Sequence, residues 1–258
     1  ELTIAEIEAD EMTDLVVVAD GEVIISDIDA ALADTIDFSD ADAGVTITAL
    51  SNGAAAVTVT MGDGNDSVTL TDTTGNYTID LGAGNDTFVS HDGIDTITTG
   101  TGIDTVSIRG DAGDNANIIT DFTAGTGGDV IDLGADIATA LTTGNVNAFT
   151  LDTANATGTN LTVTEGLLAV DFAEVTALDA VTVKAFIQDF FGSGGTAELV
   201  FGNSGDNVYL AVDDGTDTGL YLLDAGATDS SGTTVTLIAT LENVEVEALN
   251  ASNFADFV

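Results

Sequence analysis

The sequence predicts an all-β chain wound as a parallel β-roll, or β-solenoid, and capped by a C-terminal β-rich region with one or two helices. Three observations lead to this fold class: a nine-residue repeat in the first half of the chain, short apolar alternations that precede it, and longer strand-like runs in the C-terminal third. A chain of 258 residues with 44% hydrophobic residues can bury a substantial core. The composition is thus that of a folded protein in spite of its acidity.

The repeat has nine residues and ends in a short apolar alternation. Three units run head to tail, LGAGNDTFV at 81–89, SHDGIDTIT at 90–98 and TGTGIDTVS at 99–107, and weaker copies occupy 61–69, 72–80 and 110–118. Glycine at the loop positions permits a tight turn, and the x-apolar-x ending predicts a very short strand with one buried side chain. The expected buried side chains are Val68, Ile79, Phe88, Ile97, Val106 and Ile118.

The segments around the repeat divide the chain into four parts. Short apolar alternations at 34–38, 45–48 and 57–60 lack the Gly-Asp turn, so residues 1–60 are expected to be N-terminal rungs of the same coil, without metal turns. The remaining parts are the repeat region at 61–133, a linker at 134–160 and the cap at 161–258. In the cap we expect strands at 197–202, 207–214, 219–226, 234–241 and 244–249, and a helix where Val183, Phe186, Ile187 and Phe190 have helical spacing.

Charge excludes several classes of partner and activity. The chain has 45 Asp and Glu against two Lys and Arg, a formal net charge of −43, so nucleic acid is excluded as a partner. Oxygen ligands in such number, with one His and no Cys, favour calcium over transition metals. No apolar run approaches the roughly 18 residues that span a bilayer, so no membrane insertion is expected. Without GxSxG or HExxH motifs we expect no enzyme, and His91 is expected to be a solvent-facing turn residue.

The repeat also predicts where calcium binds. Glycine lets the turn fold so tightly that its carbonyl groups face a cation, and the Asp adds charge. Because two units complete one coil, units 61–69, 81–89 and 99–107 share one edge, called here the first edge, and units 72–80, 90–98 and 110–118 share the second edge.

The two edges differ in their carboxylates. The first edge carries Asp66, Asp86 and Asp104, and we expect two calcium ions between its successive turns, with carbonyl groups of Gly62, Gly64, Gly82, Gly84 and Gly102 completing the shells. On the second edge the Asp position falls on Tyr77, Asp95 and Asn115. We therefore expect a weaker site there, formed by Asp95 with help from Asp92 and Gly93 of the same turn.

These turns resemble a known family. GDGND at 62–66, GAGNDTF at 82–88 and GTGIDTV at 100–106 are similar to the repeats-in-toxin (RTX) family of calcium-binding bacterial secreted proteins, and 118–133 resembles the segment that often follows those repeats. The resemblance implies a secreted, extracellular or cell-surface protein, exported by a type I machinery that reads an uncleaved C-terminal signal. The end LNASNFADFV is similar to such a signal. Low cytosolic calcium would keep the chain unfolded, and millimolar calcium outside would fold it.

Two functions fit this combination. The first is a structural protein that self-associates through calcium into a surface layer, sheath or filament. It is indicated by a chain rich in Ala, Thr, Gly and Val and almost free of Lys and Arg, a composition that resembles RTX-type surface-layer proteins. The second is the calcium-folded export and stability module of a larger secreted enzyme, toxin or adhesin. The first is favoured because residues 1–60 have the pattern of further coil.

Overall fold

The structure is a computed structural model, and it describes residues 2–8, 13–29, 33–51, 56–71, 75–109, 116–133, 150–153, 161–163, 166–171, 177–179, 182–183, 199–201, 207–225 and 233–255. The described residues are almost entirely strands, with two short 3-10 helices, η2 (Val246–Ala248) and η3 (Ala251–Asn253). The all-β prediction is confirmed.

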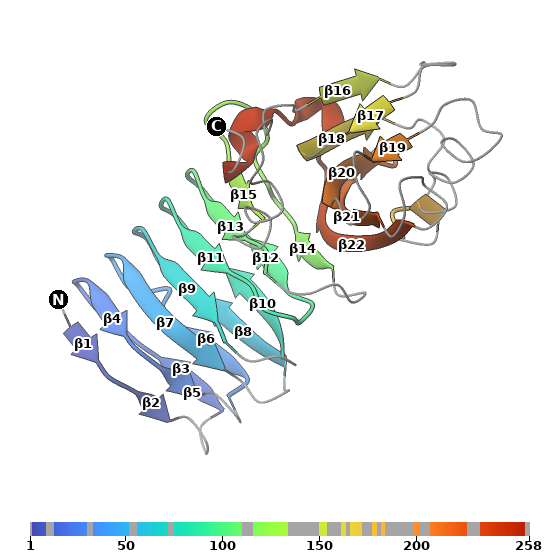
Figure 1. Cartoon of the computed structure of the whole chain (residues 1–258). Helices are drawn as coiled ribbons and strands as arrows, with labels where there is room; N and C mark the ends of the chain where they lie inside the picture. Colours follow the sequence, from blue (N-terminus) through green and yellow to red (C-terminus); the bar gives the residue numbers. More distant parts are fainter. Residues whose placement is uncertain are drawn as a thin grey trace.

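Two parallel sheets face each other along a coil that runs from the N-terminus to the C-terminal cap (Figure 1). Sheet A consists, in spatial order, of β1 (Leu2–Ile4), β4 (Val23–Ile25), β7 (Val45–Ser51), β9 (Ser67–Leu70), β11 (Thr87–Val89), β13 (Thr105–Ser107) and β15 (Val130–Asp132), with β2 (Ile7–Glu8) and β5 (Ile28–Asp29) beside this path. The coil part of sheet B consists of β3 (Asp14–Val16), β6 (Thr35–Asp37), β8 (Ala56–Thr60), β10 (Asn76–Asp80), β12 (Thr96–Thr98) and β14 (Asn117–Ile119). The parallel β-solenoid is confirmed.

Strand pairing follows the alternation of the repeat units. Phe88 of β11 pairs with Val68 on one side and Val106 on the other, while Ile79 of β10 pairs with Ile97 of β12. Consecutive units therefore alternate between the two sheets, and every second unit stacks on the same sheet. The division of the units into two edges is correct.

The core consists of columns of apolar side chains from both sheets. Val68, Phe88, Val106 and Ile131 are fully buried and in register along sheet A. The first position of the repeat, where Gly is replaced, is also buried: Met61, Leu81, Ser90 and Thr99 are at most 2% exposed. These replacements thus add side chains to the core.

The rungs before residue 60 belong to the same coil. β4 pairs with β7 and β7 with β9 in sheet A, and β3, β6 and β8 follow one another in sheet B. The alternations at 34–38, 45–48 and 57–60 are therefore strands of the solenoid, as the sequence indicates.

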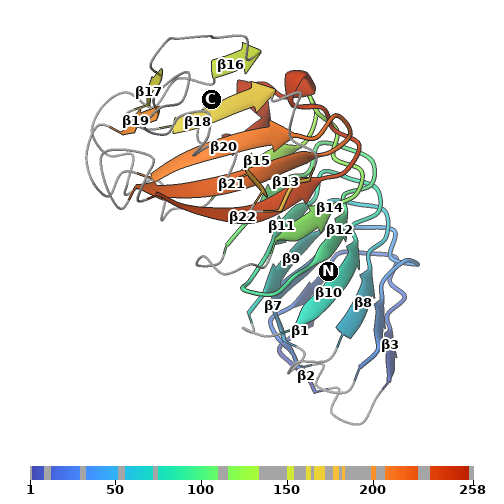
Figure 2. The same ribbon diagram turned by 90° about the vertical axis from the view of Figure 1, so that its right-hand side faces the viewer.

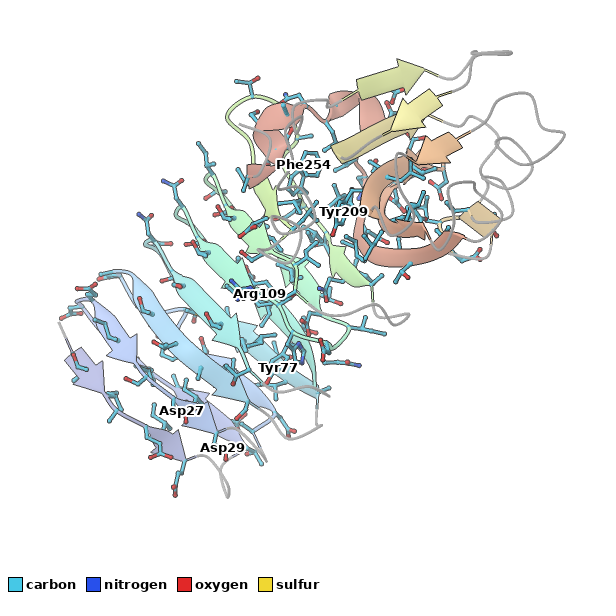
Figure 3. The ribbon with its side chains drawn as sticks, viewed as in Figure 1. Asp27, Asp29, Tyr77, Arg109, Tyr209 and Phe254 are labelled. Atoms are coloured by element: carbon cyan, nitrogen blue, oxygen red, sulfur yellow. The ribbon has the colours of Figure 1, made fainter. Side chains whose placement is uncertain are left out.

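The C-terminal cap extends sheet B and covers the end of the coil (Figure 2). β22 (Thr233–Leu241) pairs with β14 in parallel, and β21 (Thr218–Ala225), β20 (Asn207–Asp213), β18 (Gly166–Asp171) and β16 (Thr150–Thr153) follow it, while β17 (Leu161–Val163) pairs with β19 (Leu199–Phe201). On sheet A, Phe254 is fully buried and forms a bridge with Ile131 of the last strand (Figure 3).

Two details of the predicted cap need comment. The strand expected at 244–249 is wrong, because η2 occupies this segment and β22 already has β14 and β21 on its two edges. Of the helix expected at 183–190, only Val183 is among the described residues, and it is helical together with Thr182.

The register of the sixth unit also differs from the prediction. Ile119, and not Ile118, pairs with Ile97, and Asn117 takes the position of Asp95 one coil later. Asn115 lies outside the described residues. The loop that returns the chain to sheet B is longer than two nonapeptides allow, since Asp95 and Asn117 are 22 residues apart.

The core column predicts that truncating Phe88 greatly lowers the free energy of unfolding. Its ring is fully buried between Val68 and Val106, so Phe88→Ala is expected to destabilise the coil by about 3–5 kcal/mol. Urea unfolding at a fixed calcium concentration measures the change. Thr87→Ala on the exposed face of the same strand is the control and should stay within about 0.5 kcal/mol; similar losses in both variants would contradict the inward orientation.

Candidate metal centre

The predicted ligands of the first edge lie in turns stacked along the coil axis, immediately before β9, β11 and β13. Bridges join Asp63 to Ala83 and Ala83 to Thr101 in these turns. At Gly84, where φ is 150°, an added Cβ would lie 1.7 Å from the carbonyl oxygen of Gly64 in the preceding turn. Only glycine permits this approach, which directs the Gly64 carbonyl group along the axis towards the next turn.

The Asp side chains of this edge form a continuous hydrogen-bonded row. The backbone N–H of Asp66 donates to Asp86 Oδ1 at 2.7 Å, and that of Asp86 donates to Asp104 Oδ1 at 2.7 Å. At the N-terminal end of the row, Val45 N–H donates to Asp66 Oδ1 at 2.6 Å. Each carboxylate thus reaches back by one coil and uses one oxygen to hold the neighbouring turn. We call Asp66, Asp86 and Asp104 the carboxylate row.

The second oxygen of each carboxylate in this row is buried without a hydrogen bond. Asp66, Asp86 and Asp104 are at most 2% exposed, and their Oδ2 atoms have no hydrogen-bond partner. The pKa of each carboxyl group is raised to about 6, chiefly by burial and to a smaller extent by the charge of neighbouring Asp carboxylates. Buried oxygen atoms of this kind cost free energy unless a cation or a proton compensates them.

Backbone groups complete the donor set of these turns. The carbonyl oxygens of Gly62 and Gly82 accept hydrogen bonds from Ala83 N–H at 3.1 Å and Thr101 N–H at 2.9 Å, and each keeps a second lone pair. The turn that supplies Asp104 contains the last predicted carbonyl ligand, Gly102. Carboxylate and carbonyl oxygens are the ligands that calcium takes, so the residues of the first edge fit this ion.

The first edge has a fourth carboxylate that the repeat did not predict. Asp104 N–H donates to Asp129 Oδ1 at 2.9 Å, so Asp129 continues the pattern one coil further. A sequence signal was available, because GTGGD at 125–129 resembles GTGID at 100–104, with Asp129 at the position of Asp104. The insertion between these segments, 25 residues from Asp104 to Asp129, hides the repeat.

Asp129 differs from the three carboxylates before it, because protein donors reach both of its oxygens. Its Oδ2 accepts hydrogen bonds from Thr123 N–H at 2.7 Å and from Thr99 Oγ1 at 3.3 Å. The C-terminal cap also contacts Asp129, since Asn253 Nδ2 donates to the backbone carbonyl oxygen of Asp129 at 2.8 Å. The row of partly satisfied carboxylates therefore ends at Asp104.

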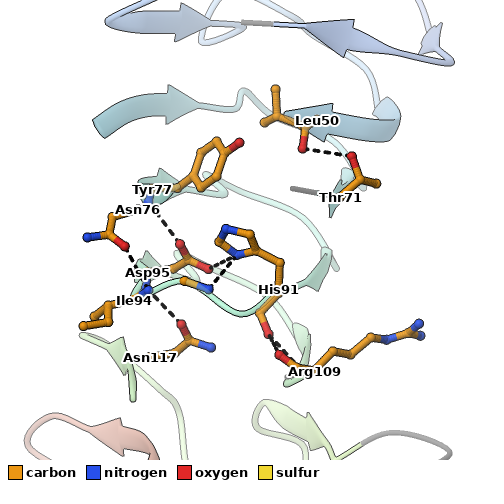
Figure 4. A network of polar contacts seen from close by, with 11 residues as sticks. Leu50, Thr71, Asn76, Tyr77, His91, Ile94, Asp95, Arg109 and Asn117 are labelled. Atoms are coloured by element: carbon orange, nitrogen blue, oxygen red, sulfur yellow. Dashed lines mark hydrogen bonds and ion pairs between the residues drawn. The ribbon is translucent and has the colours of Figure 1, made fainter. Parts of the chain in front are cut away.

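Among its described residues, the second edge carries one buried Asp, which lies beside a histidine (Figure 4). Asp95 Oδ1 accepts a hydrogen bond from Tyr77 N–H at 3.0 Å, and Asp95 N–H donates to Asn117 Oδ1 at 2.9 Å. Asp92 is exposed, so its side chain does not enter this buried turn with Asp95. Gly93 is buried, and an added Cβ there would lie 2.3 Å from His91 Cε1.

His91 is buried, which corrects the expectation of a solvent-facing residue. It is 7% exposed, and its ring packs edge-on against Tyr77 with the ring centroids 5.5 Å apart. Nδ1 lies 3.3 Å from Asp95 Oδ2. The ring lies inward because Tyr77 of the preceding coil offers it an aromatic surface. Tyr77 occupies the Asp position of its unit, where the first edge has a carboxylate.

Side-chain ligands alone do not make a metal site in this chain. Among the residues that the structure describes, no group of three or more His, Asp and Glu side chains is placed to hold an ion, so backbone carbonyl groups must contribute.

In the described part of the chain, no helix has the length and apolarity needed to cross a membrane. A scan against protein-family models finds no match, and a search of the curated proteins finds no similar sequence.

The raised pKa values predict how the metal-free protein responds to pH. Because burial raises the pKa of Asp66, Asp86 and Asp104 from 3.8 to about 6, folding favours their protonated forms. Their contribution is fully present below about pH 4 and is lost as the pH rises through about 6, at about 1.4 kcal/mol for each unit of pKa shift. Urea unfolding in a chelator across this range measures the loss.

The matched control replaces the three carboxyl groups with neutral amides. In the Asp66→Asn, Asp86→Asn, Asp104→Asn variant the slope of stability against pH between about 4 and 6 should be smaller than in the unmodified chain. A metal-free protein that becomes more stable over this range would contradict the assignment of buried, unpartnered carboxylates.

Proposed function

We propose that this chain is a secreted calcium-binding structural protein that folds and assembles on the bacterial exterior as a surface layer, sheath or filament. The observation that carries the proposal is the carboxylate row, in which three buried Asp side chains each leave one oxygen without a hydrogen bond. When bound, calcium supplies positive charge to these oxygens. Asp66, Asp86 and Asp104 would hold it together with backbone carbonyl groups of the same turns.

The charge of the whole chain supports calcium in preference to an internal base. With 45 Asp and Glu and only two Lys and Arg, the protein has almost no cations of its own to neutralise buried carboxylates. Stacked turns place these carboxylates about 4.8 Å apart along the axis, where like charges disfavour the ionised row. Calcium favours the ionised form, so its binding free energy becomes folding free energy at neutral pH.

This coupling also supports secretion. Calcium modules of the extracellular space bind with dissociation constants of about 10⁻⁴–10⁻³ M, which lie above cytosolic calcium and near the extracellular concentration. A chain that repels itself without calcium remains unfolded before export and folds outside. The resemblance to RTX repeats at 62–66, 82–88 and 100–106 supports the same route.

Assembly is supported by the N-terminal end of the coil. β1 and β3 are the terminal strands of sheets A and B, and among the described residues each pairs with a strand on one side alone. Near them Leu2, Val16 and Val18 are 49%, 60% and 67% exposed. Exposed apolar side chains grouped at one end of the coil favour contact with another surface. We propose that a second copy of the chain supplies it, with calcium between the acidic surfaces.

The alternative function is the calcium-folded export and stability module of a larger secreted enzyme, toxin or adhesin. It uses the same carboxylate row and differs in assembly, because a module has no need to associate with itself. Continuation of the coil through β1 to β8 favours the structural protein, since the described coil forms one long stack.

Calcium binding is tested at the centre of the row. Asp86→Asn keeps the shape of the side chain and its acceptor for Asp66 N–H, and removes the charge shared by both steps of the row. We expect fewer bound ions per chain by equilibrium dialysis and calorimetry. Asp29→Asn, an exposed Asp on strand β5 of sheet A, is the control and should leave the number of ions unchanged. Equal ion counts in the two variants would reject the row as the calcium site.

Assembly is tested by electron microscopy of the purified chain in millimolar calcium and after addition of a chelator. We expect regular sheets or filaments that disappear on chelation. Val16→Lys, at the terminal strand of sheet B, should weaken assembly while leaving the circular dichroism spectrum in calcium unchanged. Thr58→Lys, exposed in the middle of the same sheet, is the matched control. Compact monomers in calcium would favour the module.

A further inference from the structure

We propose that the His91 ring takes the place of a metal ion on the second edge, so that this edge of the coil folds without calcium. The inference rests on the proposed calcium function of the first edge and assigns a specific role to the single His of the chain. It follows from comparing equivalent positions of the two edges.

The two edges share the close stacking of their turns. An added Cβ at Gly93 would lie 1.9 Å from Gly75 O, as one at Gly84 would lie 1.7 Å from Gly64 O. Each edge also has a buried Asp whose Oδ1 accepts the N–H of the equivalent residue one coil earlier, from Tyr77 to Asp95 and from Asp66 to Asp86. The backbone framework that could surround an ion is therefore present on both edges.

The edges differ at the second position of the unit. On the first edge this position is Gly82 or Gly100, with φ of 84° and 86°. On the second edge it is His91, which does not have a positive φ, and the side chain turns inward onto Gly93. The imidazole ring thus occupies space inside the turn that a glycine leaves open.

The ring also faces the carboxylate oxygen that the first edge leaves without a partner. Asp95 Oδ2 has no hydrogen-bond partner, like the Oδ2 atoms of the carboxylate row, but it lies 3.3 Å from His91 Nδ1. Gly93 N–H also points to Nδ1, at 3.3 Å. When Nδ1 carries a proton it can donate to Asp95, and when it does not it accepts from Gly93. In both forms the ring fills the turn.

Among the described residues, the positions equivalent to Asp95 in the neighbouring coils carry no carboxylate. Tyr77 takes the Asp position one coil earlier and packs against the His91 ring, and Asn117 takes it one coil later. Asp95 therefore has a neutral residue on each side, in contrast to Asp86 between Asp66 and Asp104. A single carboxylate beside an imidazole ring is a poor calcium site, because calcium takes six to eight oxygen ligands.

Calcium stoichiometry of the full chain tests the inference. Asp95→Asn keeps the acceptor for Tyr77 N–H, and we expect it to bind as many calcium ions as the unmodified chain, while Asp86→Asn binds fewer. His91→Gly restores the residue found at Gly82 and Gly100, and we expect it to gain one ion, which the His91→Gly, Asp95→Asn double variant loses again. Equilibrium dialysis counts the ions, and terbium luminescence reports the sites separately.

The outcomes separate this inference from the proposed function. Loss of an ion in Asp95→Asn overturns the inference alone, provided that the unmodified chain binds calcium. A folded His91→Gly variant that gains no ion also overturns it. A chain that binds no calcium rejects the proposed function first, and with it the contrast between the edges. If His91→Gly does not fold, the ion count of Asp95→Asn still decides.

Discussion

The constraint that shapes this protein is repetition along the coil axis at the spacing of paired strands, about 4.8 Å. A side chain inside one turn lies next to the side chain at the same position of the next turn. For Val68, Phe88 and Val106 this repetition builds a dry core. For Asp66, Asp86 and Asp104 it stacks like charges in a buried row. The first result stabilises the fold at any pH, and the second makes it depend on a cation or on protons.

The ends of the carboxylate row limit how many ions it can hold between paired carboxylates. Val45 stands before Asp66, so the first step of the row has one carboxylate only. Beyond Asp104, both oxygens of Asp129 accept hydrogen bonds from protein groups, which satisfies that carboxylate without a metal. Two steps remain, Asp66 to Asp86 and Asp86 to Asp104. The expectation of two ordered ions on the first edge is therefore consistent with the row as it is built.

Much of this fold could be predicted from the sequence, because a strict period determines both register and orientation. The alternation of units between two sheets and the burial of Val68, Phe88 and Val106 follow from counting nine residues. The prediction was wrong where extra residues interrupt the nine-residue period. The long loop before Asn117 shifted the sixth unit, and the insertion before Asp129 hid a fourth carboxylate. The prediction that His91 faces solvent was wrong for a different reason. Its ring packs against Tyr77 of the preceding coil, and no local sequence pattern contains such a contact.

The two edges of the coil differ in how many buried carboxylates are stacked along them. If both edges carried stacked carboxylates, the metal-free coil would have charge repulsion along both sides of one apolar core. Here neutral residues occupy the positions equivalent to Asp95 in the neighbouring coils, and in the described part of the second edge Asp95 is the one buried carboxylate, which faces His91. The strands of sheet B connect this edge directly to the cap through β14 and β22. In the proposed function, a second edge without metal that is joined to the cap would hold the register of the coil, and calcium would act on the first edge.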